Sequence, residues 1–115
     1  MFPQTGIKLV SVVLHSHLAG KKLRLRHIRE GRELSPVAED SNYDFKYQQA
    51  RVLPQEVSVL PGDELVTECV YQTPNRTEPT FVSTVTFAFV STTSRMKLNI
   101  LAPELFFLNF STPCI

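Results

Sequence analysis

The sequence predicts an all-β fold, an antiparallel β-sandwich of jelly-roll type, and three observations lead to this prediction. Segments that alternate apolar and polar residues with a period of two recur along the chain, as expected of strands with one buried face. Turn signals separate these segments at short intervals, among them Pro61-Gly62-Asp63. No segment carries a convincing helical pattern. Several short strands between frequent turns are typical of sandwiches and jelly rolls.

The first expected strands lie in the N-terminal third of the chain. Residues 7–17 are rich in β-branched side chains and end at a turn over 18–20. Residues 23–29 alternate leucine and histidine with arginine and isoleucine, which is the pattern of a half-buried strand with a charged outer face. The tight turn at 30–32 then predicts a hairpin with a short return over 33–37.

The following strands alternate strictly. After a polar loop at 39–42, residues 43–49 alternate aromatic and polar side chains, so we expect a strand with its aromatic face in the core. The aromatic residues concerned are Tyr43, Phe45 and Tyr47. Residues 52–59 and 64–72 repeat the alternation. The remaining expected elements are a proline-containing loop at 73–79, an uncharged core strand at 81–90, and short apolar runs at 96–101 and 105–110.

Length and composition favour one domain over residues 1–115. The chain has 43% hydrophobic and 20% charged residues, which is ordinary for a soluble globular protein. The formal net charge of +1 gives no reason to expect a nucleic acid or an anionic membrane surface as partner. The basic residues of 21–29 alternate with leucine and isoleucine, so they indicate the solvated face of a strand rather than a nucleic-acid patch.

Several features concern the cellular compartment. The two cysteines, Cys69 and Cys114, are too few to fix it. The acceptor patterns Asn75-Arg76-Thr77 and Asn109-Phe110-Ser111 favour a glycoprotein of the secretory pathway. The N-terminus lacks a signal-peptide pattern, and no apolar stretch has the length of a membrane span. A fragment, a processed piece or a truncated gene product would each explain this combination.

The most informative chemical feature is His15-Ser16-His17, at the end of the first apolar run. Strand side chains alternate faces, so the two imidazoles are expected on one face. Such a pair is half of a site for copper, zinc, iron or nickel, and a third ligand must come from elsewhere. The alternative is a pair of strand histidines without a metal. His27 has no partner at ligand spacing and is expected on a strand face. Cys69 is expected to be a buried or unpaired structural thiol rather than a nucleophile.

An ordered series of motifs resembles the C-terminal catalytic domain of the copper type II, ascorbate-dependent monooxygenases, the family of dopamine β-hydroxylase and its DBH-like relatives. The resemblance runs from about residue 6 to residue 73. The histidine pair is followed at a characteristic distance by a Leu-Pro-Gly-Asp turn and a Thr-x-Cys-x-Tyr strand. The matching segments are 14–20, 28–33, 42–48 and 59–71.

The resemblance implies a fold, a cofactor and a reaction. Family members have two β-sandwich domains with one copper each, and the domain resembled here binds the copper at which oxygen and substrate meet. Its ligands would be His15, His17 and Met96, although Met96 is equally compatible with a core position. The implied activity is hydroxylation of a small amine by O₂ with ascorbate as electron donor, in a secretory vesicle, outside the cell or at a membrane. The N-terminal domain with the other copper is not in this chain.

Residues 74–115 depart from the family pattern. Arg95 stands where the family has glutamate before the methionine, and Lys97 stands where it has the cysteine that bridges to the position of Cys69. A bridge between Cys69 and Cys114 would be a rearrangement. These departures leave a second hypothesis open, a catalytically inactive β-sandwich remnant, and we expect no activity from the isolated chain. An immunoglobulin-like interaction module is disfavoured because the chain has no tryptophan.

Overall fold

The computed structural model describes residues 4–75, 77–79 and 84–91, and nearly all of its regular structure is antiparallel β. The strands are β1 (Ile7–Ser16), β2 (Gly20–Arg29), β3 (Arg32–Glu33), β4 (Ala38–Asp40), β5 (Arg51–Val59), β6 (Glu64–Tyr71) and β7 (Thr84–Ser91). Within the described residues, the single helical element is the 3₁₀ turn η1 (Phe45–Tyr47). The predicted all-β class is therefore confirmed.

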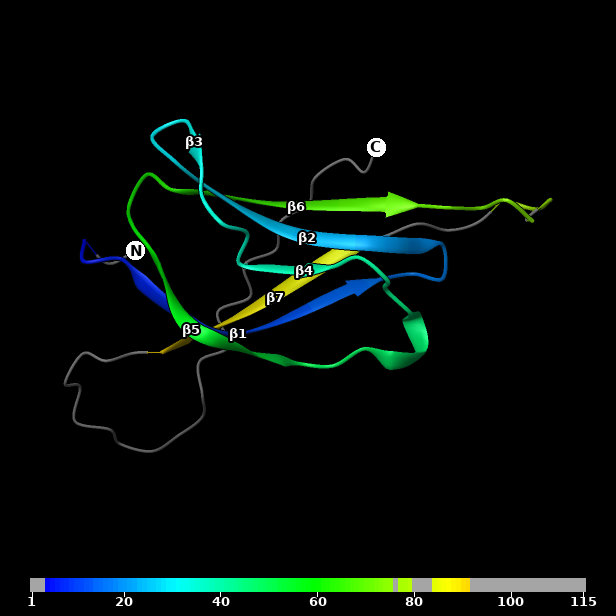
Figure 1. Cartoon of the computed structure of the whole chain (residues 1–115), viewed down its shortest axis with the longest axis horizontal. Coiled ribbons are helices and arrows are strands. Elements are labelled where there is room, and N and C mark those ends of the chain that lie inside the picture. The colour runs from blue at the N-terminus through cyan, green and yellow to red at the C-terminus, as the bar shows by residue number, and fades with distance from the viewer. Residues whose placement is uncertain (1–3, 76, 80–83, 92–115) are drawn as a thin grey trace.

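The strands form two antiparallel sheets. In the three-stranded sheet, β1 lies between β5 and β7. In the four-stranded sheet, β2 is central, with β6 along one side and β3 and β4 along the other. Figure 1 shows β2, β4 and β6 running side by side while β1 and β7 cross them obliquely. This arrangement confirms the antiparallel sandwich, and the jelly-roll connectivity stays a prediction.

The core lies between the sheets and is built on the central strands β1 and β2. Leu9, Val12, Leu23 and Leu25 are at most 1% exposed. Burying a side chain of this size stabilises a fold by roughly 1.5–3 kcal/mol, so these four positions contribute strongly to the packing of β1 on β2. A buried hydrogen bond of 3.0 Å from Thr67 Oγ1 to Thr86 Oγ1 adds a polar link between β6 and β7.

A bulge in β1 decides which side chains face the core. The register of β1 shifts between Leu9 and Ser11 against both β5 and β7. Leu9 and Val12 are consequently both buried although they are three residues apart, which a regular strand would not allow. Beyond the bulge, Val12, Leu14 and Ser16 face inward. The alternate residues, His15 among them, therefore face away from the interior of the sandwich.

The strands predicted at 7–17, 23–29, 52–59 and 64–72 are confirmed as β1, β2, β5 and β6, with small differences at their ends. Two shorter predictions were wrong in part. The return expected over 33–37 is reduced to the two residues of β3, and the expected polar loop at 39–42 contains most of β4. Residues 38–40 pair with β2 because their backbone reaches its free edge, although their sequence is mostly polar.

The strand predicted over 43–49 was wrong. This segment forms η1, because the Asp44 side chain accepts a hydrogen bond of 2.9 Å from the backbone N–H of Lys46 and caps the turn. Tyr43 is buried as expected, but Phe45 is 39% exposed and Tyr47 is 74% exposed. The strand expected over 81–90 is described as β7 from Thr84 onward, and the runs at 96–101 and 105–110 lie outside the described residues.

Candidate metal centre

His15 and His17 lie together at the carboxyl end of β1. Their ring centroids are 5.5 Å apart and the rings are nearly perpendicular, at 80°. Both side chains are half-buried; His15 lies on the face of β1 that points away from the core, and His17 is the first residue after the strand. The predicted juxtaposition of the two imidazoles is therefore present in the structure.

Tyr43 holds the backbone between the two histidines. Its hydroxyl accepts a hydrogen bond of 3.0 Å from the N–H of Ser16 and donates one of 2.7 Å to the carbonyl of Ser16. Burial is the main cause of a raised pKa for the Tyr43 phenol, to which Asp40 and Asp44 add, whereas the contact with Ser16 acts in the opposite direction. Tyr43 therefore stays neutral and can donate and accept at the same time.

The turn after His17 depends on a close approach that only glycine permits. The N–H of Gly20 donates to the carbonyl of His17 at 2.9 Å and closes the turn. A Cβ atom on Gly20 would lie 2.5 Å from Oγ and 2.8 Å from Cβ of Ser16, which is closer than real contacts allow. The N–H of Gln72 then donates to the carbonyl of Ala19, which fixes the turn to the end of β6.

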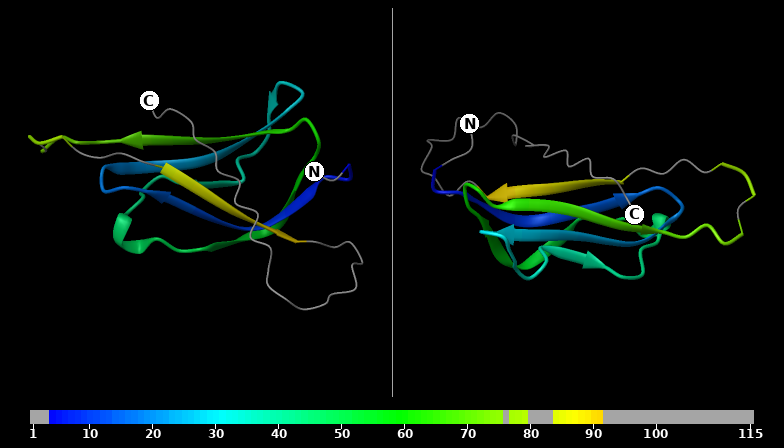
Figure 2. Two further views of the ribbon diagram at one scale, coloured as in Figure 1. Left: turned by 180° about the vertical axis from the view of Figure 1, so that it is seen from behind. Right: turned by 90° about the horizontal axis from the view of Figure 1, so that it is seen from above.

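The connection that carries η1 lies beside the end of β1, as Figures 1 and 2 show. The Nδ1 atom of His15 is hydrogen-bonded to Oε1 of Gln48, just after η1. The ring of Phe45 lies 6.3 Å from the His15 ring, tilted by 55°. One short turn thus supplies both a polar and an aromatic neighbour to the first histidine.

The two imidazoles fit a shared metal ion. A metal bonded at about 2 Å to one nitrogen of each ring would lie roughly 3 Å from both centroids, so a separation of 5.5 Å is compatible with one ion between them. No group of three or more histidine, cysteine, aspartate or glutamate side chains suited to a metal occurs among the described residues. Met96, the third ligand that the sequence motifs suggest, lies outside the described residues.

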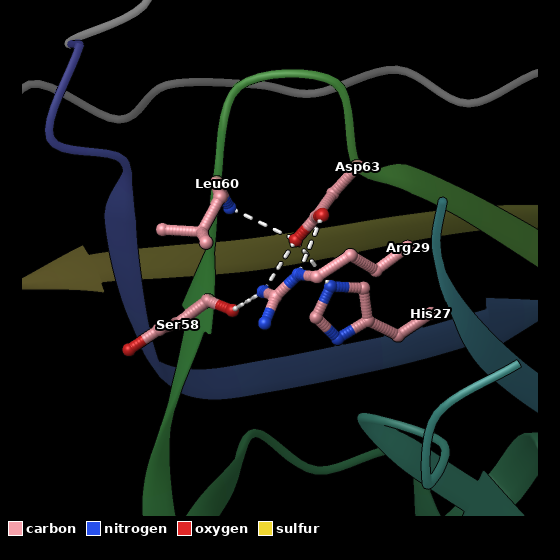
Figure 3. A network of polar contacts seen from close by, with 5 residues as sticks. All are labelled: His27, Arg29, Ser58, Leu60 and Asp63. Carbon is pink, nitrogen blue, oxygen red and sulfur yellow. Dashed lines mark hydrogen bonds and ion pairs between the residues drawn. The ribbon is translucent and has the colours of Figure 1, made fainter. Parts of the chain in front are cut away.

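His27 belongs to a separate cluster in the other sheet. Its side chain is 3% exposed and its Nε2 atom lies 2.7 Å from Oδ2 of Asp63. Arg29 also binds Asp63, through Nε and Nη2, and Figure 3 shows both β2 side chains converging on this carboxylate. The prediction that His27 is a residue of a strand face is confirmed.

Cys69 is a structural residue. It is 3% exposed and lies in the core cluster, as expected. It is also disulfide-bonded, so the prediction of a thiol at this position was wrong. Cys114 lies outside the described residues.

Gln48 and Phe45 are the site neighbours that the sequence pattern did not reveal, because both fell within the strand expected over 43–49. A signal was present at Asp44. Aspartate is depleted in strands, and its side chain readily accepts a hydrogen bond from the backbone two residues on. An aspartate inside an aromatic–polar alternation thus favours a capped turn.

Comparison with known proteins is consistent with the motifs. The family model described as "Copper type II ascorbate-dependent monooxygenase, C-terminal domain" matches residues 1–86. The chain is 52% identical over 81 residues to MOXD1 homolog 1 of Drosophila melanogaster, which covers 70% of this chain and 12% of that protein. It is 43% identical over 97 residues to DBH-like monooxygenase protein 1 of Homo sapiens, covering 84% of this chain and 15% of that protein.

Human dopamine beta-hydroxylase is a further relative, 42% identical over 74 residues, which cover 64% of this chain and 12% of that protein. The chain thus spans between 12% and 15% of the length of these three relatives. In the described part of the chain, no helix is long and apolar enough to cross a membrane. On the match over residues 1–86, the chain belongs to the copper type II ascorbate-dependent monooxygenase family and corresponds to its C-terminal domain.

Proposed function

We propose that residues 1–115 are one domain that binds a single copper ion through His15, His17 and Met96. The observation that carries the proposal is the 5.5 Å separation of the two imidazole rings at the end of β1. Two imidazoles and one thioether form a ligand set that suits copper in both of its common oxidation states. Membership of a copper-dependent family supports the choice of copper over zinc, iron or nickel.

The residues of the chain would prepare this site in three ways. Tyr43 fixes the backbone at Ser16, so the two histidines leave the strand in a set geometry. Gly20 allows the chain to turn directly after His17, at the end of β1. Phe45 contributes apolar surface beside His15. When bound, copper supplies one-electron chemistry and the activation of O₂.

For the whole protein we propose hydroxylation of a small amine, with O₂ as oxidant and ascorbate as electron donor. The printed names of the relatives, DBH-like monooxygenase and dopamine beta-hydroxylase, support this substrate class. An N-terminal domain with a second copper would be the partner of this domain in electron delivery. The isolated chain is expected to bind copper without turning over an amine.

Copper titration of the full 115-residue chain tests the metal site. We expect one copper per chain, lost in both His15→Ala and His17→Ala. Met96→Leu should weaken the binding of Cu(I) more than the binding of Cu(II), because a thioether prefers the softer ion. His27→Gln is the matched control, since it removes the third histidine and can still donate a hydrogen bond to Asp63.

Two results would contradict the assignment. Copper binding that persists in His15→Ala would mean that the metal binds elsewhere. Copper binding that is unchanged in Met96→Leu would mean that Met96 is not the third ligand. A folded chain with no measurable copper binding would favour the second candidate, an inactive β-sandwich. Amine hydroxylation by the chain alone would disprove the proposed need for a partner domain.

We further propose that the protein is a glycoprotein of the secretory pathway. The acceptor Asn75 lies exposed in a turn after β6, and Thr77 of the same pattern is also exposed. The second acceptor, Asn109, lies outside the described residues. An exposed turn gives the modifying enzyme access to the asparagine side chain, and a glycan there would extend into solvent.

A further inference from the structure

We propose that Gln48 is a positioning residue that selects the metal-binding nitrogen of His15. A neutral imidazole has one N–H and one lone pair, and a metal binds the nitrogen with the lone pair. By accepting a hydrogen bond from Nδ1–H of His15, Gln48 leaves the lone pair on Nε2. This inference rests on the proposed function of His15 as a copper ligand, but the tautomer itself exists without the metal.

The direction of this hydrogen bond follows from the other half of the Gln48 side chain. Its amide nitrogen donates a hydrogen bond of 2.8 Å to the backbone carbonyl of Phe45. A carbonyl oxygen only accepts, so the NH₂ group of Gln48 must face Phe45 and the amide oxygen must face His15. The amide oxygen also only accepts, and therefore Nδ1 of His15 carries the proton.

The turn η1 makes Gln48 a firm support. The side chain of Asp44 caps η1 at the N–H of Lys46, and the carbonyl of Asp44 accepts from the N–H of Tyr47 at 3.0 Å. These two bonds fix the backbone from which the carbonyl of Phe45 projects. Metal-binding histidines generally donate the N–H of the ring nitrogen that does not bind the metal to a nearby acceptor, which here is Oε1 of Gln48. That hydrogen bond sets both the tautomer and the orientation of the ring.

The ring of Phe45 adds a steric element. It lies 6.3 Å from the His15 ring, tilted by 55°, and so occupies part of the space beside the imidazole. Asp44, Phe45 and Gln48 thus act on His15 as one unit. His15 receives its support from a segment about 30 residues away in sequence, on the connection between β4 and β5.

The tautomer of His15 is measurable in the metal-free chain. Imidazole ¹⁵N chemical shifts and two-bond ¹⁵N–¹H correlations distinguish a protonated from an unprotonated nitrogen, at a pH where the imidazoles are neutral. We expect wild-type His15 to carry its proton on Nδ1, Gln48→Leu to lose this preference, and Gln48→Glu to restore it. An unchanged His15 tautomer in Gln48→Leu would overturn the proposal.

Gln49→Leu is the matched control. Gln49 is the exposed neighbour of Gln48, so its substitution should leave the signals of His15 as in the wild type. Circular dichroism of each variant reports on folding. If Gln48→Leu does not fold, Gln48→Asn serves as a second variant, because its shorter side chain cannot reach His15 and Phe45 together.

A copper titration of the same variants separates this inference from the proposed function. We expect Gln48→Leu to lower the copper affinity about 10- to 100-fold, Gln48→Glu to restore most of it, and Gln49→Leu to leave it unchanged. If His15→Ala leaves copper binding intact, the proposed metal site fails while the tautomer measurement still decides the role of Gln48. If His15→Ala abolishes binding and Gln48→Leu binds as the wild type, the metal site stands and the role of Gln48 fails.

Discussion

Nε2 of His27 lies 2.7 Å from Oδ2 of Asp63, and both side chains are almost inaccessible to solvent, at 3% and 2% exposed. The same carboxylate accepts two hydrogen bonds from Arg29 and one of 2.9 Å from the backbone N–H of Leu60 (Figure 3). Arg29 also donates to the carbonyl of Ser58. Asp63 therefore ties the central strand β2 to the turn between β5 and β6, and so connects the two sheets.

Substitution of Asp63 should destabilise the fold. Asp63→Ala leaves the buried His27 donor and the Arg29 guanidinium without their acceptor, and removing one partner of such a cluster is costly. We expect Asp63→Ala to lower the melting temperature by several degrees and Asp63→Asn to lower it less, because asparagine keeps one acceptor oxygen. Thermal unfolding followed by circular dichroism measures both.

Glu64→Gln is the control for this cluster, because Glu64 is the exposed neighbour of Asp63. It should unfold within about 1 °C of the wild type, as expected of a surface substitution. An equal loss in Glu64→Gln and Asp63→Ala would show that the turn tolerates no change rather than that the carboxylate links the sheets.

The protein should become less stable at acidic pH, because protonation of Glu33 weakens its contacts with two arginines. Hydrogen bonds from Arg26 and then from Arg24 lower the pKa of Glu33 from its ordinary 4.5 to about 2. Because this pKa is lower in the folded state, the contribution of the Glu33 carboxylate to the stability of the fold is complete above pH 4.5 and is lost as the pH falls toward about 2. Urea unfolding midpoints between pH 6 and pH 2 measure it.

The urea unfolding midpoint of Glu33→Gln should fall less between pH 6 and pH 2 than that of the wild type. The carboxylate is 37% exposed, so we expect a small difference that shrinks at high salt. Identical acid profiles for Glu33→Gln and wild type would contradict the prediction. The same Glu64→Gln variant serves as control. The Glu64 carboxylate of the wild type is exposed and lies outside the cluster that Arg24 and Arg26 form with Glu33.

The strands that the sequence predicted well are those in which local pattern and burial agree. Leu23 and Leu25 alternate with Arg24 and Arg26, and β2 buries the leucines and exposes the arginines in part. The alternation of 43–49 was equally regular, yet the segment forms a turn. There the hydrogen bond of the Asp44 cap prevails over the aromatic pattern.

The proximity of His15 and His17 was predictable from the sequence, but the side chains that contact His15 were not. The spacing of His15 and His17 fixes their common face through local geometry alone. Gln48 lies 33 residues from His15, and its role depends on how the connection between the sheets folds back over β1. No local pattern encodes such a contact, so the sequence indicated half of a metal site without the residue that orients it.

Tyr43→Phe should destabilise the fold and disturb the end of β1. The substitution keeps the aromatic ring in the core but removes both hydrogen bonds to Ser16. Two buried hydrogen bonds contribute roughly 1–3 kcal/mol together, so we expect a loss of this size in chemical unfolding. The ¹⁵N–¹H signals of Ser16 and its neighbours should shift as well.

Tyr47→Phe is the control for Tyr43→Phe, because it removes a hydroxyl from a side chain that is 74% exposed. It should change the free energy of unfolding by less than about 0.5 kcal/mol. If Tyr43→Phe is as stable as Tyr47→Phe, the hydroxyl of Tyr43 does not anchor β1, and the geometry of the histidine pair must rest on the Gly20 turn and the contact of His15 with Gln48.

Passage through a glycosylating secretory pathway should modify Asn75. We expect the full chain, secreted from mammalian cells behind a heterologous signal peptide, to carry an N-glycan at this exposed turn. Mass spectrometry after glycosidase treatment would detect the asparagine-to-aspartate conversion at position 75. Asn75→Gln and Thr77→Ala should both abolish it, whereas Thr77→Ser, which keeps the acceptor pattern, should retain it. Secreted protein with unmodified Asn75 would contradict the prediction, and conversion at Asn109 is read separately because its peptide is distinct.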